Sequence, residues 1–274
     1  MDTLFQALVM GVVQGLTEFL PISSSGHLII VPWLFGWKDP FITSLAFSVI
    51  LHIGTLAALL VFFRADWIRL VPAGLATLRD RSFRGDPDRK LAWLLVAATI
   101  PAAIAGFLLN DFIEEQVREP GLVALTLVIG GAIMWLADHW GSQTKDVDDV
   151  TFPVATGLGV AQAIALIPGI SRSGISISAA RFAGLNREAA ARFSFLMATP
   201  ITLGAAIFEI RKLITGEAGV AVEIGPLVVG MVAAFVSGML AIGFLLRYLR
   251  TRSLNVFVAY RLILAAIVVV VWLR

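Results

Sequence analysis

MGVVQGLTEFLPISSSG at residues 10–26 and LGVAQAIALIPGISRSG at residues 158–174 decide the fold of this chain. Each stretch contains a short apolar segment, a proline (Pro21 or Pro168), a serine-rich turn and the start of another short apolar segment. Interrupted helices at matching places in two halves of a chain are typical of membrane proteins whose site lies near the bilayer midplane. The two stretches therefore predict two broken helices that meet at one site. Seven residue pairs are identical at a constant offset of 148: Gly11/Gly159, Val12/Val160, Gln14/Gln162, Ile22/Ile170, Ser23/Ser171, Ser25/Ser173 and Gly26/Gly174.

The composition is that of an integral membrane protein. Of the 274 residues, 58% are hydrophobic and 15% are charged, and the mean hydropathy is +0.90. A soluble domain of this size could not bury so much apolar surface. The chain has no cysteine, which excludes disulfides, thiolate metal sites and cysteine nucleophiles. We expect no signal peptide, because no run of Lys or Arg precedes the first apolar stretch, and we find no nucleic-acid motif.

Six stretches are long enough to cross a bilayer, which requires about 20 apolar residues. They cover residues 43–63, 91–109, 121–137, 193–210, 225–246 and 255–273. The two motif segments, 3–36 and 152–190, are divided by their prolines into pieces that are too short to span. The sequence therefore predicts an all-α polytopic membrane protein with six transmembrane helices and two broken-helix hairpins.

Loop charges orient these segments. Residues 64–90 and 247–253 are rich in arginine, whereas residues 110–120 are acidic. The positive-inside rule places the two basic regions in the cytoplasm and the acidic loop outside. Segment 3–36 then begins and ends outside, and segment 152–190 begins and ends inside, so that both are re-entrant hairpins entering from opposite faces. We predict a single membrane domain, 1–274, built as an inverted-topology repeat of residues 1–140 and 150–274.

Gln14 and Glu18 are the first polar pair of the predicted site. They are four residues apart and therefore share one face of a helix. A glutamate in apolar surroundings is costly and is usually functional. The alternative is a protonated carboxyl group that only hydrogen-bonds a neighbouring helix. Gly11 and Gly15 have the spacing that permits close contact between helices, so we expect them to pack.

The serine-rich turns indicate an anion-binding site. Serines at a helix start cap the helix and leave its first N–H groups, at the positive end of the helix dipole, available to an anion. The planar donor fork of Arg172 suits phosphate oxygens. Alternatively, Arg172 is a structural partner of Glu18, and the two roles can coexist. The residues of the two turns are Ser23, Ser24, Ser25, Gly26 and His27 in the first, and Gly169, Ser171, Arg172 and Ser173 in the second.

The chain has three histidines. His27, next to the serine run, is the expected general acid or base. His52 lies in the middle of the predicted span 43–63, and we interpret it as a hydrogen-bonded residue between helices. His139 lies at the edge of a loop, where we expect no chemical role.

With these motifs the chain closely resembles, over its full length, the undecaprenyl-diphosphate phosphatases of the BacA type, the bacitracin-resistance family. Gln14 and Glu18 match the family pattern of Glu or Gln, three residues and Glu. Residues 23–27 match its serine-rich run ending in Gly-His, and residues 168–173 match Pro-Gly-x-Ser-Arg-Ser. Two positions depart from the pattern. Gln14 replaces a second Glu of many members, and Ser176 replaces a frequent Thr.

The resemblance implies hydrolysis of the terminal phosphate of undecaprenyl diphosphate, which recycles the lipid carrier for peptidoglycan synthesis and confers bacitracin resistance. It implies a protein of the bacterial inner membrane. The topology predicts that the active site faces the periplasm, because segment 3–36 enters the membrane from outside. A divalent cation, Mg²⁺ or Ca²⁺, is expected near Glu18, although Gln14 removes a negative charge that would favour it. The partners implied are the lipid and the bilayer. A homodimer is compatible with the sequence, which does not determine the oligomeric state.

The resemblance also assigns roles to the site residues. Ser24 is favoured as the nucleophile, while Ser23, Ser25, His27 and a water activated by Glu18 remain open alternatives. The catalytic residues implied are Glu18, Ser24, His27 and Arg172. The substrate-binding residues implied are Gln14, Ser23, Ser25, Gly26, Gly169, Ser171, Ser173 and Ser176.

Two other functions are compatible with the repeat. Inverted repeats with broken helices are the usual architecture of secondary transporters and would suit a lipid flippase. A lipid-binding protein without turnover is the third alternative. A combination of Ser, His and Glu beside an Arg favours a phosphatase, because a carrier does not need it.

Overall fold

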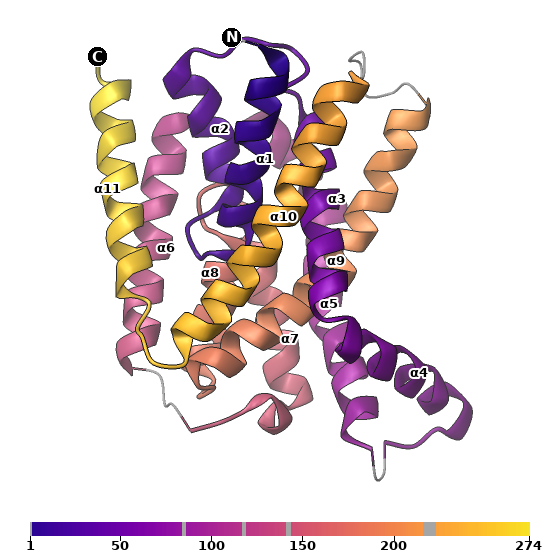
Figure 1. Ribbon diagram of the computed structural model, residues 1–274. Helices are drawn as coiled ribbons and strands as arrows, with labels where there is room; N and C mark the ends of the chain where they lie inside the picture. Colours follow the sequence, from indigo (N-terminus) through magenta and orange to yellow (C-terminus); the bar gives the residue numbers. More distant parts are fainter. Residues whose placement is uncertain (1, 84–85, 117–118, 141–143, 216–222) are drawn as a thin grey trace.

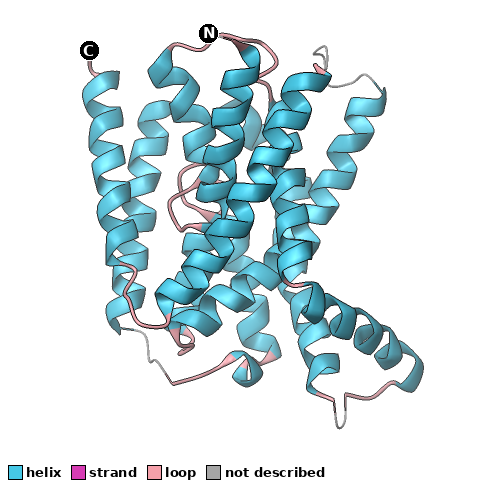
Figure 2. Ribbon diagram, in the orientation of Figure 1, coloured by secondary structure: helices cyan, strands magenta, loops and turns pink. Residues whose placement is uncertain are grey.

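A computed structural model describes residues 2–83, 86–116, 119–140, 144–215 and 223–274, and within them the chain is all-helical (Figure 1, Figure 2). The prediction of an all-α membrane protein is confirmed. Arg84, Arg118 and the side chains of Asp111, Glu114 and Glu115, which the charge argument uses, lie outside the described residues. The helices are α1 (Thr3–Phe19), α2 (Ser24–Phe35), α3 (Leu45–Phe62), α4 (Arg64–Asp80), α5 (Pro87–Gln116), α6 (Pro120–Trp140), α7 (Phe152–Ile164), α8 (Arg172–Phe182), α9 (Arg187–Thr215), α10 (Ile224–Leu249) and α11 (Asn255–Trp272), with a 3₁₀ turn, η1 (Val147–Asp149), before α7.

Five described helices, α5, α6, α9, α10 and α11, are long and apolar enough to cross a membrane. The sixth predicted span is α3, which passes the same test only together with α4. These two helices bend by 82° at Phe63, and α4 runs out from the side of the bundle in Figure 1. All six predicted spans are therefore helical.

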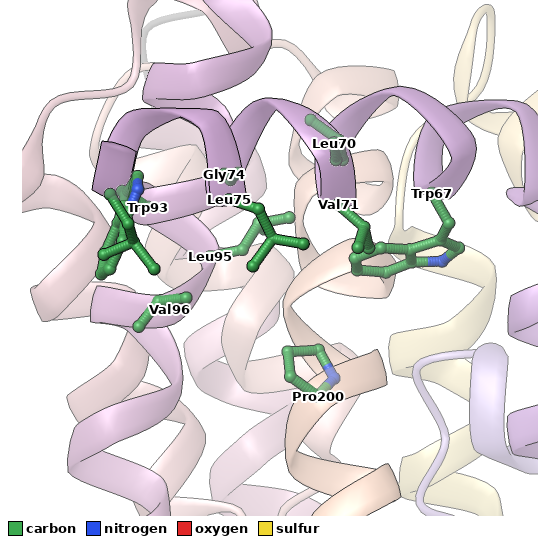
Figure 3. A pocket seen from close by; sticks show the side chains of 11 residues that line it. Trp67, Leu70, Val71, Gly74, Leu75, Trp93, Leu95, Val96 and Pro200 are labelled. Carbon is green, nitrogen blue, oxygen red and sulfur yellow. The ribbon is translucent and has the colours of Figure 1, made fainter. Parts of the chain in front are cut away.

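The prediction that the basic region 64–90 is a loop is wrong, because most of this region forms α4. Its apolar side chains recur at helical spacing, and Ile68, Leu75 and Leu78 remain exposed beside exposed arginines. This pattern is typical of a helix that lies at a membrane surface. An open pocket of about 290 Å³ lies between α4 and α5, and apolar side chains from both helices and Pro200 of α9 line it (Figure 3).

Each motif segment is a hairpin whose two ends meet. The Thr3 hydroxyl donates to Asp39 Oδ2 at 2.9 Å, which joins the beginning of α1 to the residues after α2. Around the second segment, the backbone N–H of Lys145 donates to the carbonyl of Gly184 at 3.1 Å. The helices break at residues 20–23 and 165–171, which include Pro21 and Pro168. The two predicted broken-helix hairpins are confirmed.

The hairpins enter the bundle from opposite ends. In Figure 1, α1 begins at the end that carries both chain termini, whereas η1 and the start of α7 lie at the other end. At that other end Lys90, at the start of α5, donates to the carbonyl of Asp148 at 3.2 Å. This arrangement supports the inverted repeat, while the division into residues 1–140 and 150–274 stays a prediction.

The two hairpins also pack in equivalent ways. A Cβ atom on Gly11 of α1 would lie 2.3 Å from the carbonyl oxygen of Gly230 in α10. A Cβ atom on Gly159 of α7, the repeat equivalent, would lie 2.3 Å from the carbonyl oxygen of Ala98 in α5. Each hairpin therefore needs a glycine at the same place to approach a long helix, as predicted for Gly11.

Candidate active site

Both helix breaks end in the same local structure. Ser23 and Ser171 precede α2 and α8 with φ angles of 77° and 75°. Each hydroxyl accepts the backbone N–H three residues later, at 3.3 Å from Gly26 and 3.1 Å from Gly174. Positive φ is unfavourable for serine and concentrates at functional sites. The predicted capping serines are confirmed, and their strained backbone is a finding that the sequence did not reveal.

Ser24 and Arg172 occupy equivalent positions in the two hairpins. Each is the first residue of its helix, directly after the capping serine. The hydroxyl of Ser24 therefore belongs to the positive end of the α2 dipole, and the guanidinium of Arg172 to the positive end of the α8 dipole. The repeat thus supplies two different chemical groups from one structural position.

The two turns come into direct contact. Ser173 Oγ donates to the carbonyl of Leu20 at 3.3 Å, across the two hairpins. Gly169 has a φ of 92°, and a Cβ on it would lie only 1.9 Å from Thr126 Oγ1, so glycine is required there. A Cβ on Gly26 would lie 3.6 Å from the Cα of Gly169. The expectation that the two broken helices meet is confirmed.

Arg261 of α11 holds the two turns together, and we did not identify it from the sequence. Its side chain is fully buried. It donates to the carbonyls of Pro21 in the first break and of Gly169 and Ile170 in the second, at 2.8–3.3 Å. The guanidinium is thus solvated by backbone carbonyls. An arginine within a predicted transmembrane span was the available signal, because such a residue is rare and marks a function.

Glu18 is the centre of the charged cluster. Its carboxylate is paired with the guanidinium of Arg172 and accepts the Ser24 hydroxyl at 2.5 Å and the Gln14 amide at 3.1 Å. Arg172 also donates to the hydroxyl of Thr202, in α9, at 2.5 Å. The structure therefore brings together Gln14, Glu18, Ser24 and Arg172, and it joins the two hairpins through one ion pair.

The remaining serines form two further pairs. Ser23 and Ser25 are linked through their hydroxyls at 3.4 Å, and Ser171 and Ser173 at 3.3 Å. The hydroxyl of Ser176 is buried and has no hydrogen-bond partner within the described residues. The same is true of Gln14 Oε1 and of both polar atoms of Gln162, the repeat equivalent of Gln14. Buried polar atoms without protein partners usually bind water or a ligand.

His27 does not join the Glu18 cluster as we expected. Its Nδ1 lies 2.7 Å from the carbonyl oxygen of Ser23, and its Nε2 lies 2.8 Å from the hydroxyl of Tyr260. A carbonyl only accepts, so Nδ1 carries a proton. Both ring nitrogens are thus engaged in holding the first turn, and the ring is buried.

His52, which we interpreted as a residue between helices, is the histidine that approaches Glu18. Its Nδ1 lies 2.7 Å from the carbonyl oxygen of Ser48, and its Nε2 lies 3.5 Å from Glu18 Oε2. The sequence could not reveal this contact because α1 and α3 meet only in the folded protein.

This arrangement suits chemistry on a phosphorylated substrate. A serine hydroxyl is hydrogen-bonded to a carboxylate that can accept its proton, as a nucleophile requires. The adjacent guanidinium and two helix starts supply positive charge, as a transferring phosphoryl group requires.

Comparison with known proteins agrees with this reading. Residues 7–267 match the family described as bacitracin resistance protein BacA. The chain is 45% identical to the undecaprenyl-diphosphatase of Desulforudis audaxviator, over 97% of each chain. It is 46% identical to the undecaprenyl-diphosphatase of Moorella thermoacetica, over 99% of each chain. A match of this length and identity shows the family. The chain belongs to the bacitracin resistance protein BacA family.

Proposed function

We propose that this protein is an undecaprenyl-diphosphatase, which hydrolyses undecaprenyl diphosphate to undecaprenyl phosphate and inorganic phosphate. The reaction returns the lipid carrier to peptidoglycan synthesis, and the family's name implies that it confers resistance to bacitracin. Relatives that the chain matches over almost their full length bear this name. The observation that carries the proposal is the Ser24–Glu18–Arg172 cluster at the junction of the two hairpins.

Ser24 is the serine that the contacts favour as the nucleophile. Its hydroxyl donates to Glu18 at 2.5 Å, whereas Ser23 and Ser25 are linked to each other and Ser23 also caps Gly26. Glu18 is therefore placed to accept the proton of Ser24 as the hydroxyl attacks. Ser24 is the first residue of α2, so the attacking oxygen lies at the positive end of the helix dipole.

The reaction then has two steps. Ser24 Oγ bonds to the terminal phosphorus, its proton passes to Glu18, and the bond between this phosphorus and the bridging oxygen breaks. The bridging oxygen leaves with its electron pair on undecaprenyl phosphate. Water next attacks the phosphorus of the phosphoserine, and the bond between this phosphorus and Ser24 Oγ breaks. Inorganic phosphate leaves, and Ser24 regains its proton from Glu18. Arg172 supports both steps, because its planar donor set matches the oxygens of a phosphoryl group.

The residues around Glu18 fit a divalent cation, Mg²⁺ or Ca²⁺. Gln14 Oε1 is a buried oxygen with no partner within the described residues, and Glu18 is the adjacent carboxylate. Mg²⁺ commonly binds one or two carboxylates together with substrate phosphates. Gln14 and Glu18 would hold the ion, which would neutralise charge on the diphosphate. A Gln14→Glu variant should become more dependent on added Mg²⁺, measured as activity with and without a chelator. Equal chelator sensitivity of both proteins would contradict this placement.

The active site should be reached from the periplasm, in the inner membrane of the bacterium. This part of the proposal rests on the basic regions 64–90 and 247–253 and on the entry of α1 and α2 from the opposite end of the bundle. Lipid diphosphate in the outer leaflet would then bring its head group to the hairpin junction while its tail stays among lipids. The homodimer stays a prediction from the sequence.

Phosphate release from undecaprenyl diphosphate by the purified protein in detergent tests the function. We expect release by the wild-type protein and a loss of at least about 10²-fold in Ser24→Ala. Ser253→Ala, in the turn before α11, is the matched control and should keep wild-type activity. A secondary transporter requires a sealed compartment, so turnover in detergent would exclude transport alone. A folded wild-type protein that releases no phosphate would overturn the proposal.

A further inference from the structure

We propose that the pocket between α4 and α5 binds an acyl chain of an anionic phospholipid, whose head group pairs with Arg79 and Arg81 at the end of α4. Of the residues that line this pocket, none belongs to the Ser24–Glu18–Arg172 cluster. The inference therefore goes beyond the proposed function and does not depend on it.

The lining of the pocket suits a hydrocarbon chain. Trp67, Val71 and Leu75 line it from α4, and Trp93 and Val96 line it from α5 (Figure 3). Apolar cavities stay dry and bind apolar ligands, and one of about 150 Å³ is large enough for benzene. The pocket has a volume of about 290 Å³ and is open to the outside of the protein. In a membrane, the apolar group that can enter it is a lipid chain.

The apolar face of α4 is left largely uncovered by the described residues. Val71, Leu75 and Leu78 line the pocket, yet each of these side chains is more than half exposed. Their spacing of four and then three residues places them on one face of the helix. A helix of this kind at a membrane surface buries its apolar face among acyl chains. A chain in the pocket would therefore cover the face that α5 and α9 leave open.

The charges at the end of α4 favour an anionic head group. Within residues 64–90, each described aspartate already pairs with an arginine: Asp66 with Arg69 and Arg192, Asp80 and Asp86 with Arg89, and Asp88 with Arg69. Arg79 and Arg81 are exposed and have no ion-pair partner within the described residues. These two arginines follow Leu78 of the pocket directly, so uncompensated positive charge adjoins the apolar lining. A guanidinium is a good partner for a phosphate group.

The tail of a polyprenyl lipid is the other chain that could enter the pocket. Under the proposed function, the diphosphate of such a lipid binds at the hairpin junction beside Arg172. A tail that only passes through the pocket leaves Arg79 and Arg81 without a role. A phospholipid supplies the chain and the negative charge at one place, and anionic phospholipids attract basic segments at the cytoplasmic surface of a membrane. The observations therefore favour an anionic phospholipid.

Native mass spectrometry of the full-length protein in detergent tests the head-group contact. It measures the affinities for phosphatidylglycerol and for phosphatidylcholine with the same acyl chains, and we expect the anionic lipid to bind more tightly. Arg79→Gln combined with Arg81→Gln should weaken phosphatidylglycerol binding roughly 30-fold, the effect of two basic residues near anionic lipid. Arg250→Gln combined with Arg252→Gln is the matched control, because it removes the same charge from exposed positions of the other basic region. An equal loss in both double variants, or equal affinity for the two lipids, would overturn the inference.

A second pair of variants tests the acyl-chain contact. Val96→Trp should fill the pocket and weaken phosphatidylglycerol binding at least about tenfold. Val236→Trp on α10 is the control, because Val236 lies outside the pocket and is 50% exposed, close to the 45% of Val96. Wild-type affinity in Val96→Trp would overturn the inference. Tighter binding of undecaprenyl phosphate than of phosphatidylglycerol, also lost in Val96→Trp, would overturn it by assigning the pocket to a polyprenyl lipid.

Tryptophan fluorescence locates the chain without a pocket-filling variant. Phosphatidylglycerol with brominated acyl chains quenches nearby indoles, and Trp67 and Trp93 line the pocket. At a concentration that fills only the tightest site, we expect quenching of the wild-type protein and little quenching of Trp67→Phe combined with Trp93→Phe. Equal quenching of the two proteins would place the lipid elsewhere and overturn the inference, even where Val96→Trp fails to fold. Phosphate release is not part of these measurements, so the inference and the proposed function can fail separately.

Discussion

Arg172 joins three parts of the molecule through one guanidinium group. It pairs with Glu18 of the first hairpin and donates to Thr202 of α9 from a different nitrogen, while its backbone begins α8. Two of its nitrogens are thus fixed by the protein, which orients the whole planar group. A lysine would provide one flexible point charge and could not keep these contacts while binding a diphosphate.

Arg172→Lys should therefore be nearly as damaging as Arg172→Ala. We expect both to lower kcat/KM by about 10²-fold or more, as for loss of a donor that stabilises a transition state. Arg250→Lys is the control, because Arg250 forms an exposed ion pair with Glu188. Phosphate release in detergent measures all three. Near-normal turnover by Arg172→Lys would show that only a positive charge is needed.

Glu18→Gln should abolish turnover and leave the protein folded. The amide keeps the shape of the side chain and can still accept from Ser24, but it cannot take a proton from it. Phosphate release measures the first effect and thermal unfolding in detergent the second. An active Glu18→Gln protein would count directly against a catalytic carboxylate.

At the level of single residues, the sequence predicted most of the cluster but did not reveal which histidine approaches it. Gln14 and Glu18 share a helix face, and Ser24 and Arg172 belong to recognisable motifs. His27 looked catalytic because it follows the serine run, yet its second partner is Tyr260, more than two hundred residues away. Only three-dimensional packing distinguishes it from His52, because side-chain neighbours across helices leave no local pattern.

Helix α1 packs closely against α10, and glycine at position 15 permits this close packing. A Cβ on Gly15 would lie 2.0 Å from Ser237 Oγ and 2.5 Å from the carbonyl oxygen of Ala234. The backbone carbonyl belongs to α10 and cannot turn aside as a side chain can. Since α1 carries Gln14 and Glu18, a displaced α1 would also displace the carboxylate from Arg172.

Gly15→Ala should therefore destabilise the protein by roughly 1–3 kcal/mol, the usual cost of forcing atoms into a packed interior, and lower its activity. Gly157→Ala on α7 is the control, because nothing lies within 4 Å of a Cβ built there. There, alanine should leave stability unchanged or slightly raise it. Thermal unfolding in detergent compares the two variants. Equal unfolding temperatures would contradict the close contact.

The helix breaks were predictable from the sequence, and α4 was not. Proline, serine and glycine mark both breaks, but Pro72, Pro101 and Pro200 lie inside helices that continue past them. What distinguishes Pro21 and Pro168 is the serine turn that follows, whose hydroxyls cap a new helix. The many charges in 64–90 suggested a loop. An amphipathic helix at a membrane surface carries such charges on one face, so its sequence does not resemble that of a transmembrane helix.

Over the whole molecule, the two hairpins open at opposite ends and meet in the middle. Non-helical backbone at membrane depth is tolerated only where protein buries it or a wet cavity adjoins it. Arg261 of α11 contributes to the burial of both breaks, because its guanidinium donates hydrogen bonds to backbone carbonyls in each of them. The inverted repeat therefore builds a site near the middle of the molecule to which one hairpin contributes Glu18 and Ser24 and the other contributes Arg172.

The orientation of this assembly in the membrane can be tested by cysteine labelling, since the native chain has no cysteine. Arg81, after α4, and Glu119, before α6, are both exposed and lie in the regions that we assign to the cytoplasm and to the outside. On intact cells, a membrane-impermeant thiol reagent should label Glu119→Cys and not Arg81→Cys, and both should react once the cells are opened. Labelling of Arg81→Cys alone would invert the orientation. In that case α1 and α2 would open to the cytoplasm, and the enzyme would act on lipid diphosphate of the inner leaflet.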